Sequence, residues 1–253
     1  MITFTEAQII GWLLALLLPL FRLLGLFSSA PLLSSRSIPV RYRVVAALSL
    51  SLLAAPIVHG NTPNLDDPNL FLVLANEVLT GLAIGLISRV LLVSMEMAGE
   101  IIGLQMGLSF ASFFDSSTNN NANAIGRLFN AISLACFATL NGPLLLIATT
   151  MKSIEVLPSG IDARQFLGRI DIAAVLSQIF QLGLLMALPY MALLLFINLS
   201  LGLISRIAPQ INIFAIGFPI TISAGLLLLT LNLPALSQPI AELHQTLFSI
   251  LGF

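Results

Sequence analysis

Residues 172–204 read IAAVLSQIFQLGLLMALPYMALLLFINLSLGLI, a run that is almost entirely apolar and contains no charged residue. A bilayer core about 30 Å thick is crossed by roughly 20 apolar residues in a helix, so this run is long enough to span it. Similar runs recur along the chain between short polar connections, at residues 7–30, 44–59, 70–95, 125–151 and 211–233. Because a helix satisfies its own backbone groups, we expect an all-α membrane protein and not a barrel.

The composition of the whole chain agrees with a membrane environment. Hydrophobic residues make up 58% of the 253 residues, charged residues only 8%, and the mean hydropathy is +1.04. Soluble domains carry about 25% charged residues, so water is not the solvent of most of this surface. The formal net charge of -1 provides no basic face for phosphates, which argues against a nucleic-acid partner.

The polar connections near the start of the chain carry signals of sidedness. Residues 1–8 contain Glu6 and no Lys or Arg, so they lack the basic region of a cleavable signal peptide, and we expect the first apolar run to remain as a helix. The connection at residues 31–43 holds Arg36, Arg41 and Arg43 without an acid, which is typical of a cytoplasmic loop. Later sidedness depends on whether residues 99–114 cross the membrane.

The most informative stretch is residues 95–123, MEMAGEIIGLQMGLSFASFFDSSTNNNAN. Small residues recur at every fourth position, where a helix would present a ridge with almost no side chain and allow very close packing. They are Gly99, Gly103, Gly107 and Ala111. Gly81 and Gly85 form a second pair with the same spacing, and we expect both sets to lie at helix contacts.

Several charged residues lie inside apolar runs, where they need solvent or a partner. Glu96 and Glu100 share a stripe beside the glycine ridge and are expected to face a cavity or another subunit. Glu77 and Arg89 are over three helical turns apart, so they cannot pair within one straight helix, and each needs another partner, such as one on another chain. For Arg22, Arg127 and Arg206 we expect the long side chain to reach the membrane interface.

The apolar run at residues 101–114 is short and is interrupted by Gln105, which favours a re-entrant or buried segment over a full span. A short apolar element, tethered to the polar linker at residues 116–123, could block a pore by excluding water. Its members are Met106, Gly107, Leu108, Phe110, Phe113 and Phe114. The plainer alternative is that these side chains only pack against neighbouring helices.

Motifs of catalysis are missing from the sequence, which contains no zinc-protease, phosphate-loop, dinucleotide or nucleophile-elbow pattern. Cys136 is the single cysteine, and by itself it can form neither an internal disulfide nor a metal cluster. We therefore expect no enzyme, no metal and no cofactor.

Four stretches together carry a resemblance along nearly the whole chain: APLLSSRSIPVRYR at 30–43, GEIIGLQMGLSFASFFD at 99–115, LNGPLLL at 140–146 and LSLGLISRIAPQINIFAIGFPITI at 199–222. The chain resembles the FliR family of flagellar biosynthetic proteins, a component of the type III protein-export gate. In that family the plug that blocks the pore corresponds to the segment from Gln105 through the Asn-rich linker.

The resemblance implies one export-gate domain over residues 1–253, with a FliP-like front part at roughly 1–170 and a FliQ-like helical hairpin at roughly 171–253. Kinked hairpins would form one wedge of a conical assembly with FliP-like and FliQ-like subunits, near FlhA-type and FlhB-type proteins, in the bacterial inner membrane at the flagellar basal body. Unfolded flagellar proteins would pass through it. Two alternatives stay open: the equivalent subunit of a virulence injectisome, and a small-solute transporter that uses Glu77, Glu96 or Glu100 as an ion relay.

Overall fold

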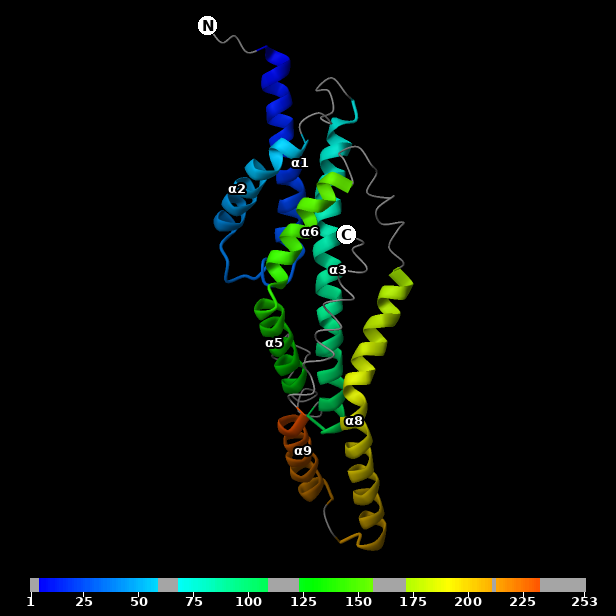
Figure 1. Ribbon diagram of the computed structural model, residues 1–253. Coiled ribbons are helices and arrows are strands. Elements are labelled where there is room, and N and C mark those ends of the chain that lie inside the picture. The colour runs from blue at the N-terminus through cyan, green and yellow to red at the C-terminus, as the bar shows by residue number, and fades with distance from the viewer. Residues whose placement is uncertain (1–4, 59–67, 109–122, 157–171, 211–212, 233–253) are drawn as a thin grey trace. The chain divides into compact units, whose positions relative to one another are not determined.

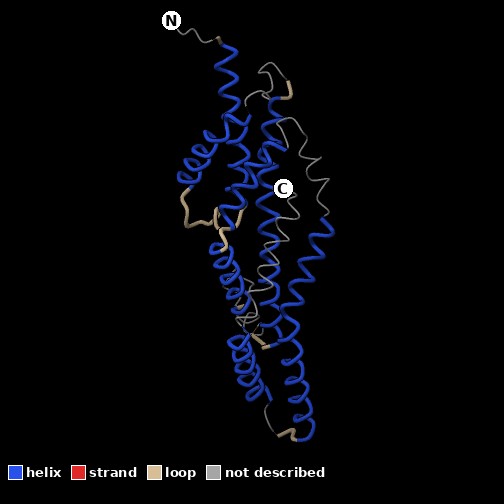
Figure 2. Tube along the Cα trace, in the orientation of Figure 1, coloured by secondary structure: helices blue, strands red, loops and turns tan. Residues whose placement is uncertain are grey.

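The computed structural model describes residues 5–58, 68–108, 123–156, 172–210 and 213–232, and every regular element in these ranges is an α-helix (Figures 1 and 2). This confirms the all-α prediction. The helices are α1 (Glu6–Ser29), α2 (Val40–Val58), α3 (Leu70–Gln105), α5 (Ala124–Thr139), α6 (Gly142–Val156), α8 (Ile172–Ile207) and α9 (Ile213–Asn232).

Four of the described helices contain stretches long and apolar enough to cross a membrane. These stretches are Gln8–Ser29, Leu70–Gln105, Leu176–Ile207 and Ala215–Asn232. A fifth crossing is available if α5 and α6 together form one broken span. Four of the six apolar runs predicted from the sequence therefore correspond to helices of membrane-spanning length. The run at residues 44–59 lies in α2, which is not one of these candidate spans, and the run at 125–151 forms the pair α5 and α6.

Helix α3 corrects one expectation about the segment that follows residue 95. Residues 70–95 and 99–114 were expected to form separate elements, yet α3 continues without a break from Leu70 to Gln105. The glycines at 99 and 103 lie at close contacts, Gly99 against the backbone of Ile125 and Gly126 and Gly103 against the side chain of Asn123. Only after Gln105 does the chain leave the helix.

The run at residues 125–151 also differs from expectation, because it forms two helices. The break falls at Leu140 and Asn141, between α5 and α6. Asn141 has a φ of 58°, a left-handed conformation that asparagine tolerates better than most residues. Pro143 follows in the first turn of α6, where its missing N–H has no intrahelical partner to lose.

The chain divides into two compact units, and each is described by itself. One unit comprises Met1–Val90, Phe137–Val175 and Thr246–Phe253, and includes α1, α2, α6 and the first part of α3. The other comprises Leu91–Cys136 and Leu176–Gln245, and includes the rest of α3, most of α5, α9 and nearly all of α8. The division into a FliP-like front part and a FliQ-like rear part is a different partition and stays a prediction.

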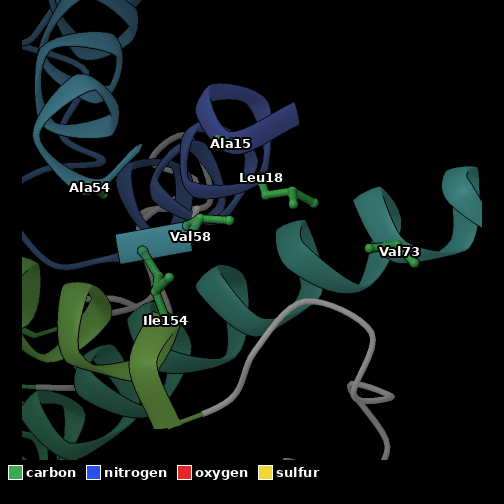
Figure 3. Close-up of a cluster of buried hydrophobic side chains, with 6 residues drawn as sticks. All are labelled: Ala15, Leu18, Ala54, Val58, Val73 and Ile154. Atoms are coloured by element: carbon green, nitrogen blue, oxygen red, sulfur yellow. The ribbon is translucent and has the colours of Figure 1, made fainter. Parts of the chain in front are cut away.

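Apolar side chains from four helices form the core of the first unit (Figure 3). Its buried members are Ala15 and Leu18 of α1, Ala54 and Val58 of α2, Val73 of α3, and Ile154 of α6. A second cluster joins Leu23 and Phe27 of α1 to Ala47 of α2. Since α1 and α2 both contribute to the two clusters, the contact between these two helices is the centre of this unit's packing.

Candidate functional site

A buried ion pair joins three helices of the first unit. Arg22 of α1 donates from Nε to Oε2 of Glu77 at 2.6 Å and from Nη2 to Oε1 at 3.0 Å, which is the bidentate geometry of a strong pair. Its Nη1 donates to the hydroxyl of Ser153 in α6 at 3.0 Å. The two charged side chains are only 3% and 4% exposed, so this is a charge pair removed from solvent.

The ion pair answers two expectations about polar residues in apolar runs. Arg22 does not reach the membrane interface, because its side chain is buried, and its guanidinium donates hydrogen bonds to Glu77 and Ser153. Glu77, expected to need a partner such as one on another chain, has that partner within its own chain. Arg89 and Arg206 are exposed, so they remain available to solvent, lipid or other subunits.

Small residues let α1 and α3 approach closely beside this pair. A Cβ added at Gly81 would overlap the carbonyl oxygen of Arg22, and one added at Gly85 would overlap the side chain of Ser29. The Ser29 hydroxyl in turn donates to the carbonyl of Leu82 at 3.1 Å. Glu77, Gly81 and Gly85 follow each other every four residues, so one face of α3 provides both the charge and the close contact.

In the second unit, the C-terminus of α3 is closed by a glycine cap. Gly107 has a φ of 81°, and its N–H donates to the carbonyl of Leu104 at 3.0 Å. The N–H of Leu108 donates to the carbonyl of Gly103 at 3.0 Å. These two bonds form a Schellman motif, in which glycine is favoured because it adopts positive φ without steric cost. Gly107 therefore ends α3.

Helices α8 and α9 hold this cap in place. Asn198 of α8 donates to the carbonyl of Gln105 at 3.3 Å, and Thr221 of α9 donates to the carbonyl of Met106 at 3.1 Å. Met106 is fully buried, and Phe218 of α9 lies so close to Gly107 that an added Cβ would be 2.5 Å from its ring. Both bonds satisfy carbonyls that the end of the helix leaves without intrahelical partners.

A groove of about 350 Å³ runs between these three elements. Its walls include Leu104 of α3 and Gly107 just after it, Asn198 and Leu201 of α8, and Phe218 of α9. The lining combines apolar side chains with the amide of Asn198. The groove therefore lies directly at the point where the chain leaves α3.

Glu100 and Asn123 connect α3 to the start of α5. Oε1 of Glu100 accepts the N–H of Asn123 at 2.8 Å, and the carbonyl of Glu100 accepts Nδ2 of Asn123 at 3.0 Å. Oδ1 of Asn123 accepts the N–H of Gly126 at 2.8 Å, which makes Asn123 the N-cap of α5. The predicted ridge residues Gly99 and Gly103 face this junction, because a Cβ on either would meet Ile125 or Asn123.

Glu96 makes a similar contact one turn earlier on α3. Its Oε2 accepts Nδ2 of Asn130 in α5 at 2.6 Å. The two carboxylates that were expected to face a cavity or another subunit thus each accept an amide hydrogen bond from the same chain. In the described ranges, no group of three or more His, Cys, Asp or Glu side chains could hold a metal ion.

Comparison with known proteins relates this helical arrangement to protein export. Residues 13–247 match the family described as bacterial export proteins, family 1. The chain belongs to this family.

Relatives with assigned names come from several bacteria. The flagellar biosynthetic protein FliR of Escherichia coli (strain K12) is 36% identical over 100% of this chain and 97% of its own length. FliR of Pectobacterium carotovorum subsp. carotovorum is also 36% identical, with the same coverage, and FliR of Buchnera aphidicola subsp. Acyrthosiphon pisum is 34% identical over 93% of this chain and 92% of its own. The predicted resemblance to the FliR family is confirmed.

Membership of the export family and the names of the relatives support the conclusion that this chain is a component of the flagellar export apparatus. They indicate a structural export protein, not an enzyme. The several apolar helices fit a membrane protein. Three residues of the predicted plug, Met106, Gly107 and Leu108, are described by the structure. The other predicted plug residues, Phe110, Phe113 and Phe114, lie outside the described residues, and so does Ala111 of the predicted glycine ridge.

Sequence reasoning missed the polar residues that tie the export protein's helices together. Asn123 had a recognisable signal, because an asparagine directly before an apolar helical run is a common N-cap. Asn130, Asn198 and Thr221 carry no comparable signal, since each bonds a residue that is remote in the sequence. Their roles become visible only when the helices are packed.

Proposed function

We propose that this chain is a structural subunit of the flagellar type III protein-export gate, and that it helps to form and close the channel for unfolded flagellar proteins. The family membership and the flagellar names of the relatives support this proposal. Substrates pass through the assembled gate passively, driven by separate energy-supplying components. The chain itself performs no catalysis.

The observation that carries the proposal is the fixed C-terminus of α3. The glycine cap at Gly107 and the hydrogen bonds from Asn198 and Thr221 give the following segment a defined base. In the proposal, Phe110, Phe113 and Phe114 close the lumen beyond this base. Apolar constrictions of this kind block ions by excluding water.

The proposed partners are FliP-like and FliQ-like subunits, with FlhA-type and FlhB-type proteins nearby, and the proposed location is the bacterial inner membrane at the flagellar basal body. Large apolar side chains on several helices are exposed in the single chain, among them Phe71, Phe196 and Ile207. Such surfaces are stable only against lipid or other subunits. A hetero-oligomeric gate in a membrane provides both.

The arrangement of the carboxylates favours a gate over a small-solute transporter. A relay residue must exchange its proton or ion with a passing substrate. Glu77 instead holds a bidentate pair with Arg22, and Glu96 and Glu100 each accept an amide hydrogen bond. The flagellar names of the relatives favour flagellar export over the equivalent injectisome subunit.

Ion conductance of the assembled gate in a planar bilayer tests the proposal. Deletion of residues 109–114 leaves the cap at Gly107 and Leu108 in place and removes the apolar plug residues, so leak should rise strongly. Deletion of six polar residues, 116–121, is the length-matched control and should leak much less. Unchanged conductance of the 109–114 deletion, in a gate that still co-purifies with its partner subunits, would contradict the proposal.

A further inference from the structure

Helix α2 runs antiparallel to α1 and begins beside the end of the first candidate span. Leu23 of α1 shares a cluster with Ala47 of α2, whereas Leu18, earlier in α1, shares one with Ala54, later in α2. The candidate span in α1 ends at Ser29. The connection between the two helices therefore lies at the edge of the apolar layer, and α2 extends from that edge back along α1.

This connection and the first turn of α2 carry positive charge without an acid. Arg36 and Arg41 are exposed, and residues 31–43 contain no Asp or Glu. Arg43 donates from Nη2 to the carbonyl of Ser35, which holds the connection against the first turn of the helix. Cations at a helix N-terminus are disfavoured by the helix dipole, whereas an anion there is attracted by the dipole and by the arginines together. This end of α2 is therefore suited to an anionic group.

Apolar side chains continue from Arg41 along one exposed face of α2. Val45, Leu48 and Leu52 are exposed and follow Arg41 at spacings of four, three and four, so they lie on the same side of the helix, and we call them the apolar stripe. From Arg41 to Leu52 the helix rises about 17 Å. The hydrocarbon layer of one leaflet is roughly 15 Å thick. The apolar stripe therefore matches the length of an acyl chain in one leaflet.

A groove lies at each end of the apolar stripe. The outer groove, of about 450 Å³, is at the start of α2, and its walls include Arg41, Tyr42 and Val45. The inner groove, of about 530 Å³, lies between α1 and α2, and its walls include Trp12 and Leu52. The outer groove combines a cation with an exposed aromatic ring, which is typical of the membrane interface, and the inner groove is lined by apolar side chains.

We propose that this face of α2 binds one anionic phospholipid, with its phosphate at Arg36 and Arg41 and an acyl chain along the apolar stripe to the groove beside Trp12. Charge and length together select this occupant. A zwitterionic headgroup offers the arginines no net charge, and a small free anion leaves the apolar stripe uncovered. The cytoplasmic leaflet, on the side predicted for the basic connection, carries anionic lipids. The site goes beyond the proposed gate and does not depend on it.

The single tryptophan of the chain reports on this site, because Trp12 lines the inner groove. The purified full chain in detergent is titrated with phosphatidylglycerol whose acyl chains carry bromine, which quenches a neighbouring indole. Quenching of Trp12 should saturate. Phosphatidylcholine with the same brominated chains should need about 30-fold more lipid, since each arginine near an anionic headgroup contributes about fivefold in affinity. Excess glycerol phosphate supplies the headgroup charge alone and should not displace the lipid.

Two double variants test the contribution of the charges. Arg36→Gln with Arg41→Gln should bind the brominated phosphatidylglycerol about 30-fold more weakly than the wild type. The matched control is Arg89→Gln with Arg206→Gln, which removes the same charge from two exposed arginines outside both grooves. The control should bind as the wild type does.

Two leucine variants test the contribution of the apolar stripe. Leu48→Asn places an amide in the middle of the stripe and should weaken binding about tenfold. Leu53 is also exposed but lies about 100° around the helix from Leu52, so Leu53→Asn should bind as the wild type does. All the substituted side chains are exposed, and every variant should keep the wild-type midpoint of thermal unfolding.

Three outcomes would contradict the proposal. If phosphatidylcholine quenches Trp12 as strongly as phosphatidylglycerol, or if both double variants lose the same affinity, the headgroup is not recognised. If glycerol phosphate displaces the lipid, the arginines form a simple anion site. If neither lipid quenches Trp12 in the folded chain, this face of α2 is left for another subunit. None of these results bears on the proposed gate, which the conductance of the deletion variants tests separately.

Discussion

Arg22 and Glu77 illustrate how two charges are accommodated among apolar helices. Moving either charge alone out of water would cost several kcal/mol, and the attraction between them offsets this cost only with good geometry and further hydrogen bonds. Both conditions are met, because the pair is bidentate and Ser153 accepts from the remaining guanidinium nitrogen. Ser153 then donates to the carbonyl of Thr150 at 2.6 Å, so each polar atom of this chain of bonds has a partner.

Removing one member of this pair should be far worse than removing both. Glu77→Ala leaves the guanidinium of Arg22 buried without its counter-ion, and should destabilise the protein by about 3–5 kcal/mol. The double variant Arg22→Met with Glu77→Leu should regain much of that stability, since packed apolar groups replace the charges. Thermal unfolding of the purified complex in detergent measures both effects.

The control for this prediction is Arg89→Met, which changes an exposed arginine on the same helix and should alter stability by no more than about 0.5 kcal/mol. Equal losses for Glu77→Ala and for the double variant would show that the charges are not coupled as the geometry indicates.

Gly107 and Gly202 form a matched pair of glycines with opposite expectations. Gly107→Ala forces a side chain into left-handed backbone and against the ring of Phe218, and should cost about 2 kcal/mol or more. Gly202 lies inside α8 with open space around it, so Gly202→Ala should be neutral or stabilising by up to about 1 kcal/mol. The midpoints of thermal unfolding report both. A neutral Gly107→Ala would be inconsistent with the observed cap.

At the scale of the elements, α3 uses two sets of small residues for two contacts. Gly81 and Gly85 meet α1 within one unit, and Gly99 and Gly103 meet the start of α5 within the other. In an apolar solvent, helices gain little from hydrophobic burial, so close packing at small residues carries much of their association. The spacing therefore has the same physical purpose at both places.

The contact of α1 with α3 should be energetically coupled to the ion pair. Gly81→Ala places a Cβ against the Arg22 carbonyl, which pushes α1 away and should cost about 1–3 kcal/mol. Because this shift also disturbs the bidentate geometry, Glu77→Ala should cost less in the Gly81→Ala background than in the wild type. A double-mutant cycle should give a coupling energy of about 0.5 kcal/mol or more. Strict additivity would mean that the two features act independently.

Hydropathy is a local signal, and it predicted the all-α class and most of the helices. The four-residue spacing is also local, and Gly81, Gly85, Gly99 and Gly103 lie at close contacts, whereas Gly107 ends α3. The sequence was insufficient where competing signals met or where partners were remote. The runs at residues 70–95 and 99–114 were expected as separate elements, yet α3 continues from Leu70 to Gln105, with Gly99 and Gly103 packed against the start of α5. Arg22 and Glu77 are separated by 55 positions, and no periodicity links them. The break at Asn141 depends on one residue with positive φ.

At the scale of the whole molecule, the helices differ in how much of their surface the chain itself covers. In the most apolar window of each helix, 44% of the residues of α1 are buried, against 28% in α8 and 22% in α9. On α8, the exposed side chains Phe196, Leu199 and Leu203 follow at spacings of three and four, so they share one face. In an oligomeric gate, such a face is the natural place for another subunit.

A photo-crosslinking amino acid at Phe196, which is 71% exposed, tests this expectation in the complete chain. When partner subunits are co-expressed, illumination should yield protein adducts of defined mass, because a subunit seated on this face brings C–H bonds within reach of the probe. The same probe at Met106, which is fully buried inside its unit, is the matched control and should give no intersubunit adduct. If Phe196 yields lipid adducts alone while the complex stays assembled, this face of α8 is lipid-covered, and the subunit contacts must lie on other helices.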